Sequence, residues 1–319
     1  MMVSTIQARR LWVLMVAAAT MTFRPGTTPS AELPAHDSTS QGSSKSPNQP
    51  MDTVTIEAAR ERQLKHQISD YLSGALVTYS YDSLERWDSP ICPAVGGLPK
   101  ERGEFILARL SQIARDAHAP LAGEHCSPNL VVAVTDDPDR LVAKWTKHYW
   151  TRFNTCNGMG YLNDFLHSKQ VVRVYYNARF SSGGSERDIS ALEIIGANLG
   201  TFHNNPCTGG GVAGTRLSWG AVQELRSVII VVDSRRTTSL NMGQLADYVA
   251  MVGLAQIRTE GDTGTAPTIL RLFGKADPPP EGLSPWDQSF LHGLYTTRQG
   301  SVMQVSTIKT AMFEQMAGH

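Results

Sequence analysis

One pair of neighbouring elements constrains the fold of this chain most: an apolar strand followed by an apolar helix. The strand has the sequence SVIIVVD at residues 227–233, and the helix has the sequence GQLADYVAMVGLAQI at residues 243–257. A short, continuously apolar run that ends in a turn is typical of a buried strand, and apolar residues at helical spacing indicate a buried helix face. We therefore expect an α/β (α+β) fold in which this helix lies in the core.

A similar alternation of strand and helix is predicted in the first half of the chain. The short apolar segment 91–98 precedes a helix at GEFILARLSQIARDA, and NLVVAVT at residues 129–135 predicts a buried strand. Asp137 and Pro138 then start another helix, as N-cap and first-turn residue. This capping explains the acidic cluster DDPD (136–139) with fewer assumptions than a calcium site. Residues 54–150 are thus predicted to form a small β-α-β-α subdomain.

The second half is predicted to form a further α+β subdomain over residues 151–319. VVRVYYNARF at residues 171–180 alternates as a strand does, and ALVTYSY at residues 75–81 has strand composition in the first half. Ser284 is an expected N-cap, with Pro285 at the first helical position and Asp287 at the capping-box position. A last helix is expected over residues 302–316.

The N-terminal segment predicts export to the periplasm or secretion. A basic start, MMVSTIQARR, precedes thirteen apolar residues, which is shorter than the ~20 needed to span a bilayer. We expect a signal peptide at residues 1–23, a disordered Ser/Pro/Thr-rich linker at residues 24–53, and no membrane span in the mature chain. The 29 basic and 29 acidic side chains balance, which argues against binding to nucleic acid.

Four cysteines, Cys92, Cys126, Cys156 and Cys207, fit an exported chain with two disulfides. Three connectivities are possible. Their order favours Cys92–Cys126 and Cys156–Cys207, because each pair then closes a loop within one half. Zinc binding is the alternative, but no CxxC or HxxxH spacing accompanies these cysteines.

The strand and helix at 227–257 resemble the active-site region of zincin-like metallopeptidases. Aligning the pattern HExxHxxG with ADYVAMVG places Ala246 and Ala250 at the two histidines, Asp247 at the glutamate and Gly253 at the glycine. The segment LSPWDQSFLHGLY also resembles an LSxxDxxFLxxLY element of exported bacterial proteins of unknown function, whose relatives include candidate zinc-dependent peptidases. ICPAVGGL and CSPNLVVAVT resemble the same uncharacterised family. The resemblance covers about residues 75–316.

What the resemblance implies is a zincin-like scaffold without zinc. Alanine cannot ligate a metal, and catalytic zinc needs three protein ligands and an open position. Neither His203 nor His292 has a partner at metal-ligand spacing. We expect no metal and no other cofactor. No catalytic residue is assigned, and Asp247 is the single candidate, at the position of the general base.

Other chemistry has less support in the sequence. GGGVAG at residues 209–214 matches the dinucleotide pattern GxGxxG but lacks the strand before it and the helix after it. No GxSxG is present, and Ser182 lacks a supporting pattern. Carboxylates such as Glu224, Asp247 and Asp287 could meet in space as in a glycosidase, although each is explained as a cap or surface charge.

Three functions therefore stay open. The first is a non-catalytic exported protein, a pseudoenzyme whose zincin-like scaffold binds a peptide or protein partner. The second is a metal-independent periplasmic hydrolase that uses carboxylates, with Asp247 as its base. The third is an envelope-associated structural factor. A cluster of aromatic residues in the middle of the chain suits a binding groove or ordinary strand packing.

Overall fold

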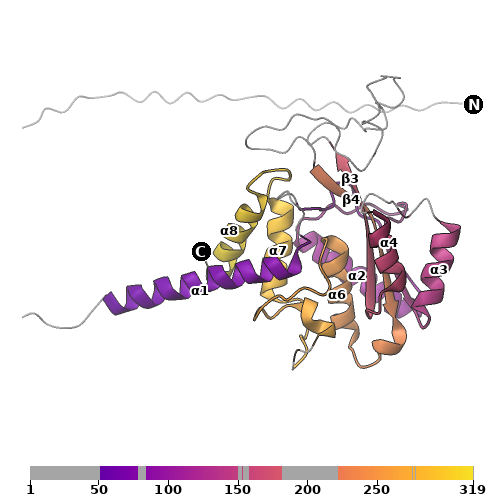
Figure 1. Ribbon diagram of the computed structural model, residues 1–319, viewed down its shortest axis with the longest axis horizontal. Coiled ribbons are helices and arrows are strands. Elements are labelled where there is room, and N and C mark those ends of the chain that lie inside the picture. Colours follow the sequence, from indigo (N-terminus) through magenta and orange to yellow (C-terminus); the bar gives the residue numbers. More distant parts are fainter. Residues whose placement is uncertain are drawn as a thin grey trace, which may run out of the picture. The chain divides into compact units, whose positions relative to one another are not determined.

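The computed structural model describes residues 51–77, 84–149, 153, 158–181, 222–274, 276 and 278–318. In these residues seven α-helices accompany a four-stranded mixed sheet (Figure 1), which confirms the predicted mixed α/β character. Residues 50–319 cluster as one compact unit. The predicted signal peptide and the predicted linker up to residue 50 lie outside the described residues.

The sheet joins both halves of the chain. Its strand order is β1-β2-β4-β3, in which β1, β2 and β4 are parallel and β3 is antiparallel to β4. β2 from the first predicted subdomain therefore lies beside β4 from the second. The strands are β1 (Pro93–Gly96), β2 (Leu130–Thr135), β3 (Val172–Ser181) and β4 (Val222–Asp233).

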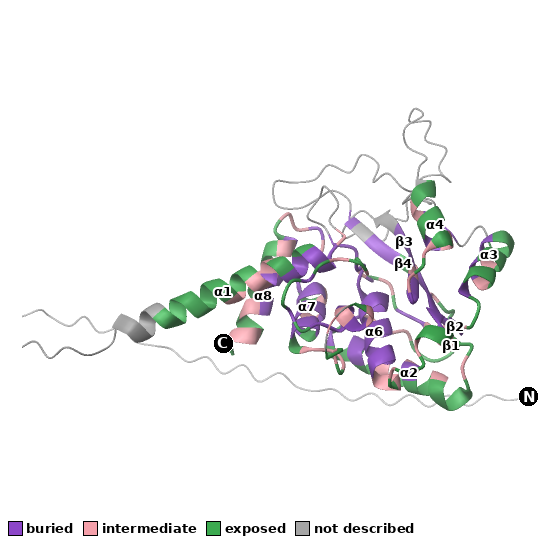
Figure 2. Cartoon of the chain, turned by 60° about the horizontal axis from the view of Figure 1, so that its bottom comes forward, coloured by how far each residue is buried: buried purple, intermediate pink, exposed green. Residues whose placement is uncertain are grey.

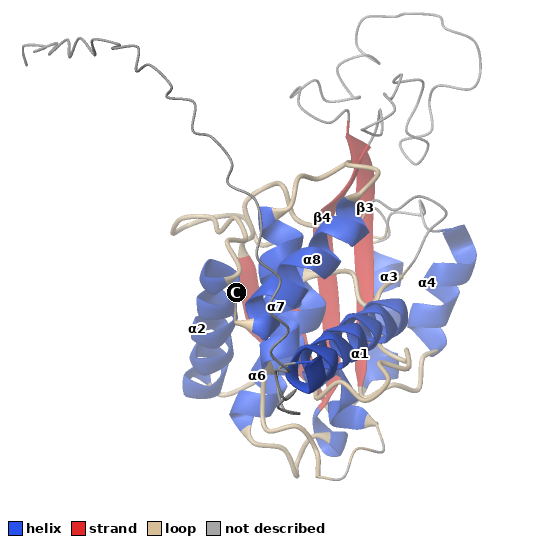
Figure 3. Cartoon of the chain, turned by 90° about the vertical axis from the view of Figure 1, so that its left-hand side faces the viewer, coloured by secondary structure: helices blue, strands red, loops and turns tan. Residues whose placement is uncertain are grey.

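Both faces of the sheet are covered by helices (Figure 3). Alternate residues of β4 divide between two cores: Val228 and Ile230 belong to the cluster that includes α2 and α6, and Ile229 and Val231 to the cluster that includes α3 and α4. Burial on both faces explains why β4 is continuously apolar in sequence. The helices are α2 (Lys100–Asp116), α6 (Met242–Leu254), α3 (Pro138–His148) and α4 (Gly158–His167).

Three further helices lie on the α6 side: α1 (Met51–Ala75), α7 (Pro285–Thr296) and α8 (Gln304–Ala317). Figure 2 shows that α1 is buried where it reaches the other helices and exposed toward its N-terminal half. Ile68, Tyr71 and Leu72 carry this burial. Lys65 Nζ also lies 4.3 Å from the ring centroid of Phe313 on α8.

The predicted helix starts are confirmed where local capping specifies them. The Asp137 side chain accepts a hydrogen bond from the backbone N–H of Arg140 at 3.1 Å, with Pro138 at the first helical position. Ser284 and Asp287 form the predicted capping box of α7, with Pro285 in the first turn. No helix in the described part of the chain combines the length and apolar character needed to cross a lipid bilayer.

One predicted strand is changed by its surroundings. Ala75, the expected first residue of the strand at 75–81, is instead the last residue of α1, and Leu76 forms a single antiparallel bridge with Ile257. Residues 78–83 lie outside the described residues. Ala75 is completely buried in the main core, and its place in the last turn of α1 agrees with the high helix propensity of alanine.

The predicted disulfide Cys92–Cys126 is present, with the two Cα atoms 5.9 Å apart. It links the residue just before β1 to the loop before β2, where Asn129 also bridges the two segments. The Asn129 side chain accepts from the backbone N–H of Cys92 at 2.7 Å and donates to the carbonyl of Pro90 at 3.0 Å. Cys156 and Cys207 lie outside the described residues, so their pairing stays a prediction.

Candidate functional site

Helix α6 is the core helix that the sequence predicts. It begins with a capping box: the Asn241 side chain accepts from the backbone N–H of Gln244 at 2.8 Å, and the Gln244 side chain accepts from that of Asn241 at 3.1 Å. Every residue from 244 to 254 is buried. A helix that is apolar on all sides is stable only when it is enclosed by other elements, as this one is by the sheet, α2 and α7.

The two alanines that the predicted alignment places at metal-ligand positions lie within this core. Ala246 and Ala250 have no solvent exposure, and both belong to the main apolar cluster. Gly253 brings the helix against the sheet, because a Cβ atom there would lie 3.1 Å from Leu130 Cδ1 and 3.4 Å from Ile230 Cδ1. Among the described residues, no group of three or more His, Cys, Asp or Glu side chains could hold a metal ion.

Asp247 is engaged by two other elements. Its Oδ1 accepts from Arg109 Nε on α2 at 2.5 Å, and its Oδ2 accepts from Arg109 Nη2 at 3.0 Å. Oδ2 also accepts from the backbone N–H of Leu283, ahead of α7, at 2.7 Å. The hydrogen bond to Asp247 raises the pKa of the Arg109 guanidinium. Asp247 thus joins α2, α6 and the segment before α7.

The residue next to Asp247 faces a cleft. This α6 cleft has a volume of about 380 Å³ and lies where β4 ends and β3 begins. Tyr248 on α6 and Phe273 form part of its wall, with ring centroids 4.8 Å apart and nearly perpendicular rings. Burial raises the pKa of the Tyr248 phenol, so this hydroxyl is neutral at physiological pH.

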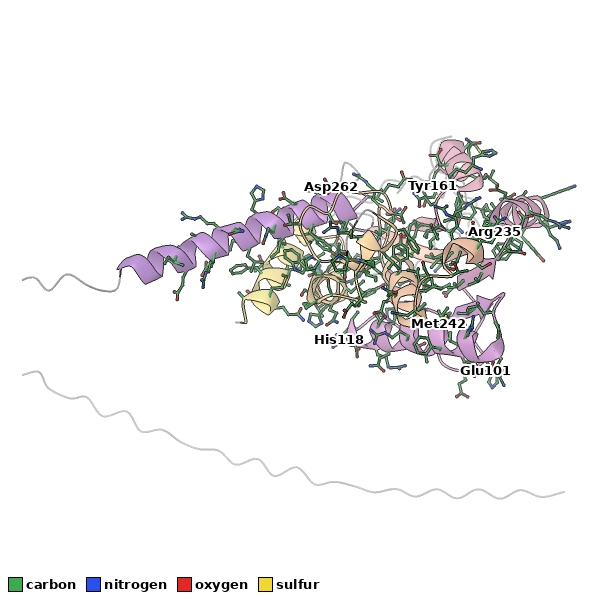
Figure 4. The ribbon with its side chains drawn as sticks, turned by 90° about the horizontal axis from the view of Figure 1, so that it is seen from below. Glu101, His118, Tyr161, Arg235, Met242 and Asp262 are labelled. Carbon is green, nitrogen blue, oxygen red and sulfur yellow. A yellow bond between two sulfur atoms is a disulfide. The ribbon has the colours of Figure 1, made fainter. Side chains whose placement is uncertain are left out.

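The polar wall of the α6 cleft comes from several separate segments. Charged side chains of both signs line it: Arg236 after β4, Glu260 and Asp262 in the loop after α6, and Arg271 in a 3-10 helix, η3 (Ile269–Phe273). Figure 4 labels Asp262, which lies beside the C-terminal part of α1. Cations, anions and two aromatic rings in one cleft suit a ligand with several kinds of functional group.

Hydrogen bonds and close backbone packing hold this wall in place. Thr259 Oγ1 donates to Gln170 Oε1 at 2.7 Å, and Arg236 Nη1 donates to the carbonyl of Lys169 at 2.6 Å. Gly261 packs directly against the backbone of Gly74 in α1, and a Cβ atom at Gly261 would overlap the Gly74 carbonyl oxygen. The loop after α6 is therefore anchored to both α1 and the segment before β3.

Asp287 and Glu224, the other two carboxylates considered from the sequence, lie outside the α6 cleft. Asp287 is completely buried and accepts hydrogen bonds from Tyr71, Thr268, Ile269 and Ser284, as a capping residue that also ties three segments together. Burial raises the pKa of its carboxyl group. Glu224 lies on β4, buried, in register with Arg179 of β3. Neither lines the α6 cleft.

The histidines and glycines singled out from sequence have different outcomes. His292 on α7 packs against His118, with ring centroids 5.1 Å apart, a partner that sequence spacing does not reveal. His203, Ser182 and the GGGVAG segment lie outside the described residues. The cleft residues Gln170, Arg236, Glu260 and Arg271 carried no motif, although three of them lie just before or after a predicted strand or helix. Their position in loops at the ends of predicted elements is the sequence signal that could have indicated a binding site, because loops often carry binding residues.

The chain matches no family model, no curated protein and no solved structure.

Proposed function

We propose that this protein is exported to the periplasm or secreted, acts without catalysis, and binds a peptide segment of a protein partner in the α6 cleft. The observation that carries the proposal is the position of this cleft, directly beside the helix whose metal-ligand positions are occupied by buried alanines. A peptidase scaffold that lost its metal would keep a substrate-binding groove and lose the chemistry.

The absence of catalysis is supported by what surrounds the zincin pattern. Ala246 and Ala250 are enclosed, and the Asp247 carboxylate is neutralised by Arg109 and hydrogen-bonded to Leu283. A general base must reach its substrate within hydrogen-bond distance, directly or through one water. Asp247 has a side-chain exposure of 5% and points toward α2, whereas Tyr248 contributes to the cleft wall.

A peptide is favoured as the ligand because of the cleft's position and its lining. It runs beside residues 170–172, which lead into β3, one of the two edge strands of the described sheet. Extended peptides bind beside sheet edges through main-chain hydrogen bonds and place alternate side chains in pockets. The volume of about 380 Å³ is within the ~300–1,000 Å³ range of ligand sites. Arg236, Arg271 and Glu260 would select charged side chains.

The zincin-like ancestry and the compartment belong to the same proposal. A strand, a following core helix and a close-packed Gly253 are the features that this chain shares with the peptidase pattern. The Cys92–Cys126 disulfide is consistent with an oxidising compartment, where such bonds form and persist.

A displayed library of random peptides, selected on the purified full chain, tests the binding. The dissociation constants of selected peptides are then measured by fluorescence anisotropy. Arg271→Ala and Glu260→Ala should weaken binding at least tenfold. Neither side chain makes a hydrogen bond with another described residue, so the substitutions should leave the fold intact. Arg140→Ala, on α3 at the other face of the sheet, is the matched control and should leave binding unchanged.

The same preparation tests the absence of catalysis. Zinc content is measured by elemental analysis, and cleavage is followed with a mixture of quenched fluorescent peptides. Stoichiometric zinc together with peptide cleavage that chelation abolishes would show that the protein is a metallopeptidase. Selected peptides whose affinity is the same for wild type, Arg271→Ala and Glu260→Ala would place binding elsewhere.

A further inference from the structure

A second concave site lies on the opposite face of the sheet, beside α3. This α3 pocket has a volume of about 210 Å³ and is lined by eight described residues: Pro128, Asn129, Val131, Trp145, Tyr149, Phe153, Ser227 and Ile229. It shares no residue with the α6 cleft. Its two strands, β2 and β4, are direct neighbours, with Val131 in register with Ile229.

The geometry of α3 explains why a pocket forms here. Trp145 lies in the last turn of α3 and Tyr149 is the cap residue that follows, so the two aromatic residues project from the same side, one turn apart. Both stand over the amino-terminal part of β2 and the matching part of β4. Tyr149 is 57% exposed, whereas Phe153 is buried against Phe165 and Tyr175. The pocket therefore opens to solvent on one side and reaches the apolar core on the other.

The polar residues of the lining already have partners. The Asn129 amide is engaged by Cys92 and Pro90, and Ser227 Oγ accepts from Asn177 Nδ2 at 2.7 Å. None of the eight lining residues carries a charge at neutral pH. What remains available to a ligand is apolar surface, three aromatic rings, the Trp145 N–H and the Tyr149 hydroxyl, with no charged group among the eight residues.

We propose that the α3 pocket binds a small, uncharged aromatic molecule. A dry apolar cavity of ~150 Å³ in a protein core is large enough to bind benzene. The larger α3 pocket therefore suits one or two fused rings. Aromatic rings of the ligand can pack edge-to-face or offset-stacked on Trp145 and Tyr149, which adds to the gain from apolar burial. A charged ligand would lose its hydration without a partner.

Binding of 5-fluoroindole to the full-length chain, followed by fluorine NMR, tests the proposal. We expect saturable binding with a dissociation constant below ~1 mM. Val131→Phe fills the pocket from its β2 wall and should weaken binding at least tenfold. Trp145→Ala removes the aromatic wall and should also weaken it, while placing no new bulk in the pocket. Benzoate, a charged compound of similar size, should not compete.

Two controls separate this site from the α6 cleft and from misfolding. Arg271→Ala should bind 5-fluoroindole as the wild type does and lose only peptide affinity. The far-UV circular dichroism spectrum and the thermal midpoint of Val131→Phe must match those of the wild type. If Val131→Phe is unstable, Trp145→Ala replaces it as the pocket variant. No saturable binding up to several millimolar, or equal affinity in wild type and both folded pocket variants, would overturn the proposal.

Discussion

The carboxylate of Asp247 on α6 accepts two hydrogen bonds from the guanidinium of Arg109 on α2, at 2.5 and 3.0 Å. The two residues are 138 positions apart in sequence. The Asp247 side chain is 5% exposed and that of Arg109 is 41% exposed, so the pair lies at the margin of the core. The residue that the predicted alignment places at a general-base position therefore joins α6 to α2 through an ion pair.

Asp247→Ala should lower the free energy of unfolding by about 2–3 kcal/mol, because it removes the nearly buried carboxylate of an ion pair and leaves the Leu283 N–H without its acceptor. Urea unfolding followed by circular dichroism measures the change. Arg115→Ala, on the same helix as Arg109 but exposed, is the control and should stay within ~0.5 kcal/mol of wild type. Equal stability of Asp247→Ala and wild type would contradict this structural role.

The burial of Glu85 predicts that the free energy of unfolding falls as the pH rises. Its side chain is buried, neither carboxyl oxygen has a hydrogen-bond partner among the described residues, and burial raises the pKa of Glu85 from 4.5 to about 8. The folded state therefore holds this proton more tightly than the unfolded state. Stability should fall between about pH 4.5 and pH 8, where the unfolded chain binds fewer protons.

Glu85→Gln should remove this pH dependence, since glutamine does not ionise. Relative to wild type, the variant should gain up to about 4 kcal/mol between pH 5 and pH 8, at ~1.4 kcal/mol per pKa unit. Urea midpoints across this pH range provide the measurement. Glu101→Gln, an exposed residue on α2, should leave the pH profile unchanged. A pH profile of Glu85→Gln parallel to that of wild type would refute the prediction.

The Cys92–Cys126 disulfide closes a loop with a sequence separation of 34 residues. Replacing both cysteines by serine should lower the free energy of unfolding by about 3–4 kcal/mol, because the unfolded chain regains loop entropy. Denaturant unfolding under oxidising and reducing conditions measures the effect. Adding a reductant should lower the stability of the wild type but not that of the variant in which both cysteines are replaced by serine. An equal response of the two proteins would contradict the prediction.

Gly261→Ala should destabilise the fold by about 1–3 kcal/mol, because its methyl group would overlap the Gly74 carbonyl oxygen of α1. The loop that carries Glu260 and Asp262 would shift, and peptide affinity for the α6 cleft should fall with it. Gly160→Ala, in α4, is the matched control, because no atom of the described residues outside the adjoining helix backbone lies within 4 Å of its added Cβ. That variant should be neutral or slightly more stable. A Gly261→Ala protein as stable as wild type would be incompatible with this packing.

Local patterns predicted the elements whose signals are contained in a few residues. The Ser284–Asp287 capping box and the Asp137 cap appear at their expected positions, and β4 contains the strand predicted at residues 227–233 but begins earlier, at Val222. In each case the determining contact is made by neighbours in sequence or by the continuous apolarity of one segment.

Contacts between distant residues could not be predicted in this way. The α6 cleft combines residue 170, the turn after β4, Tyr248 and the loop 259–264, none of which share a motif. The pairing of Asp247 with Arg109 required knowledge that α2 packs on α6. Ala75, the first residue of the strand expected at 75–81, ends α1 instead, and the core that buries it is made by residues distant in sequence.

The parallel pairing of β2 with β4 has a consequence for how the chain acquires its structure. Leu130 is in register with Val228, so the centre of the sheet is completed only by a segment from the last third of the sequence. A chain emerging from the ribosome, or passing through a membrane pore, carries β1, β2 and α2 with their apolar faces uncovered until β4 and α6 follow. Such non-local pairing slows folding and prolongs the lifetime of partly folded, aggregation-prone intermediates. The nascent protein is therefore expected to depend on chaperones that shield the first half until the second arrives.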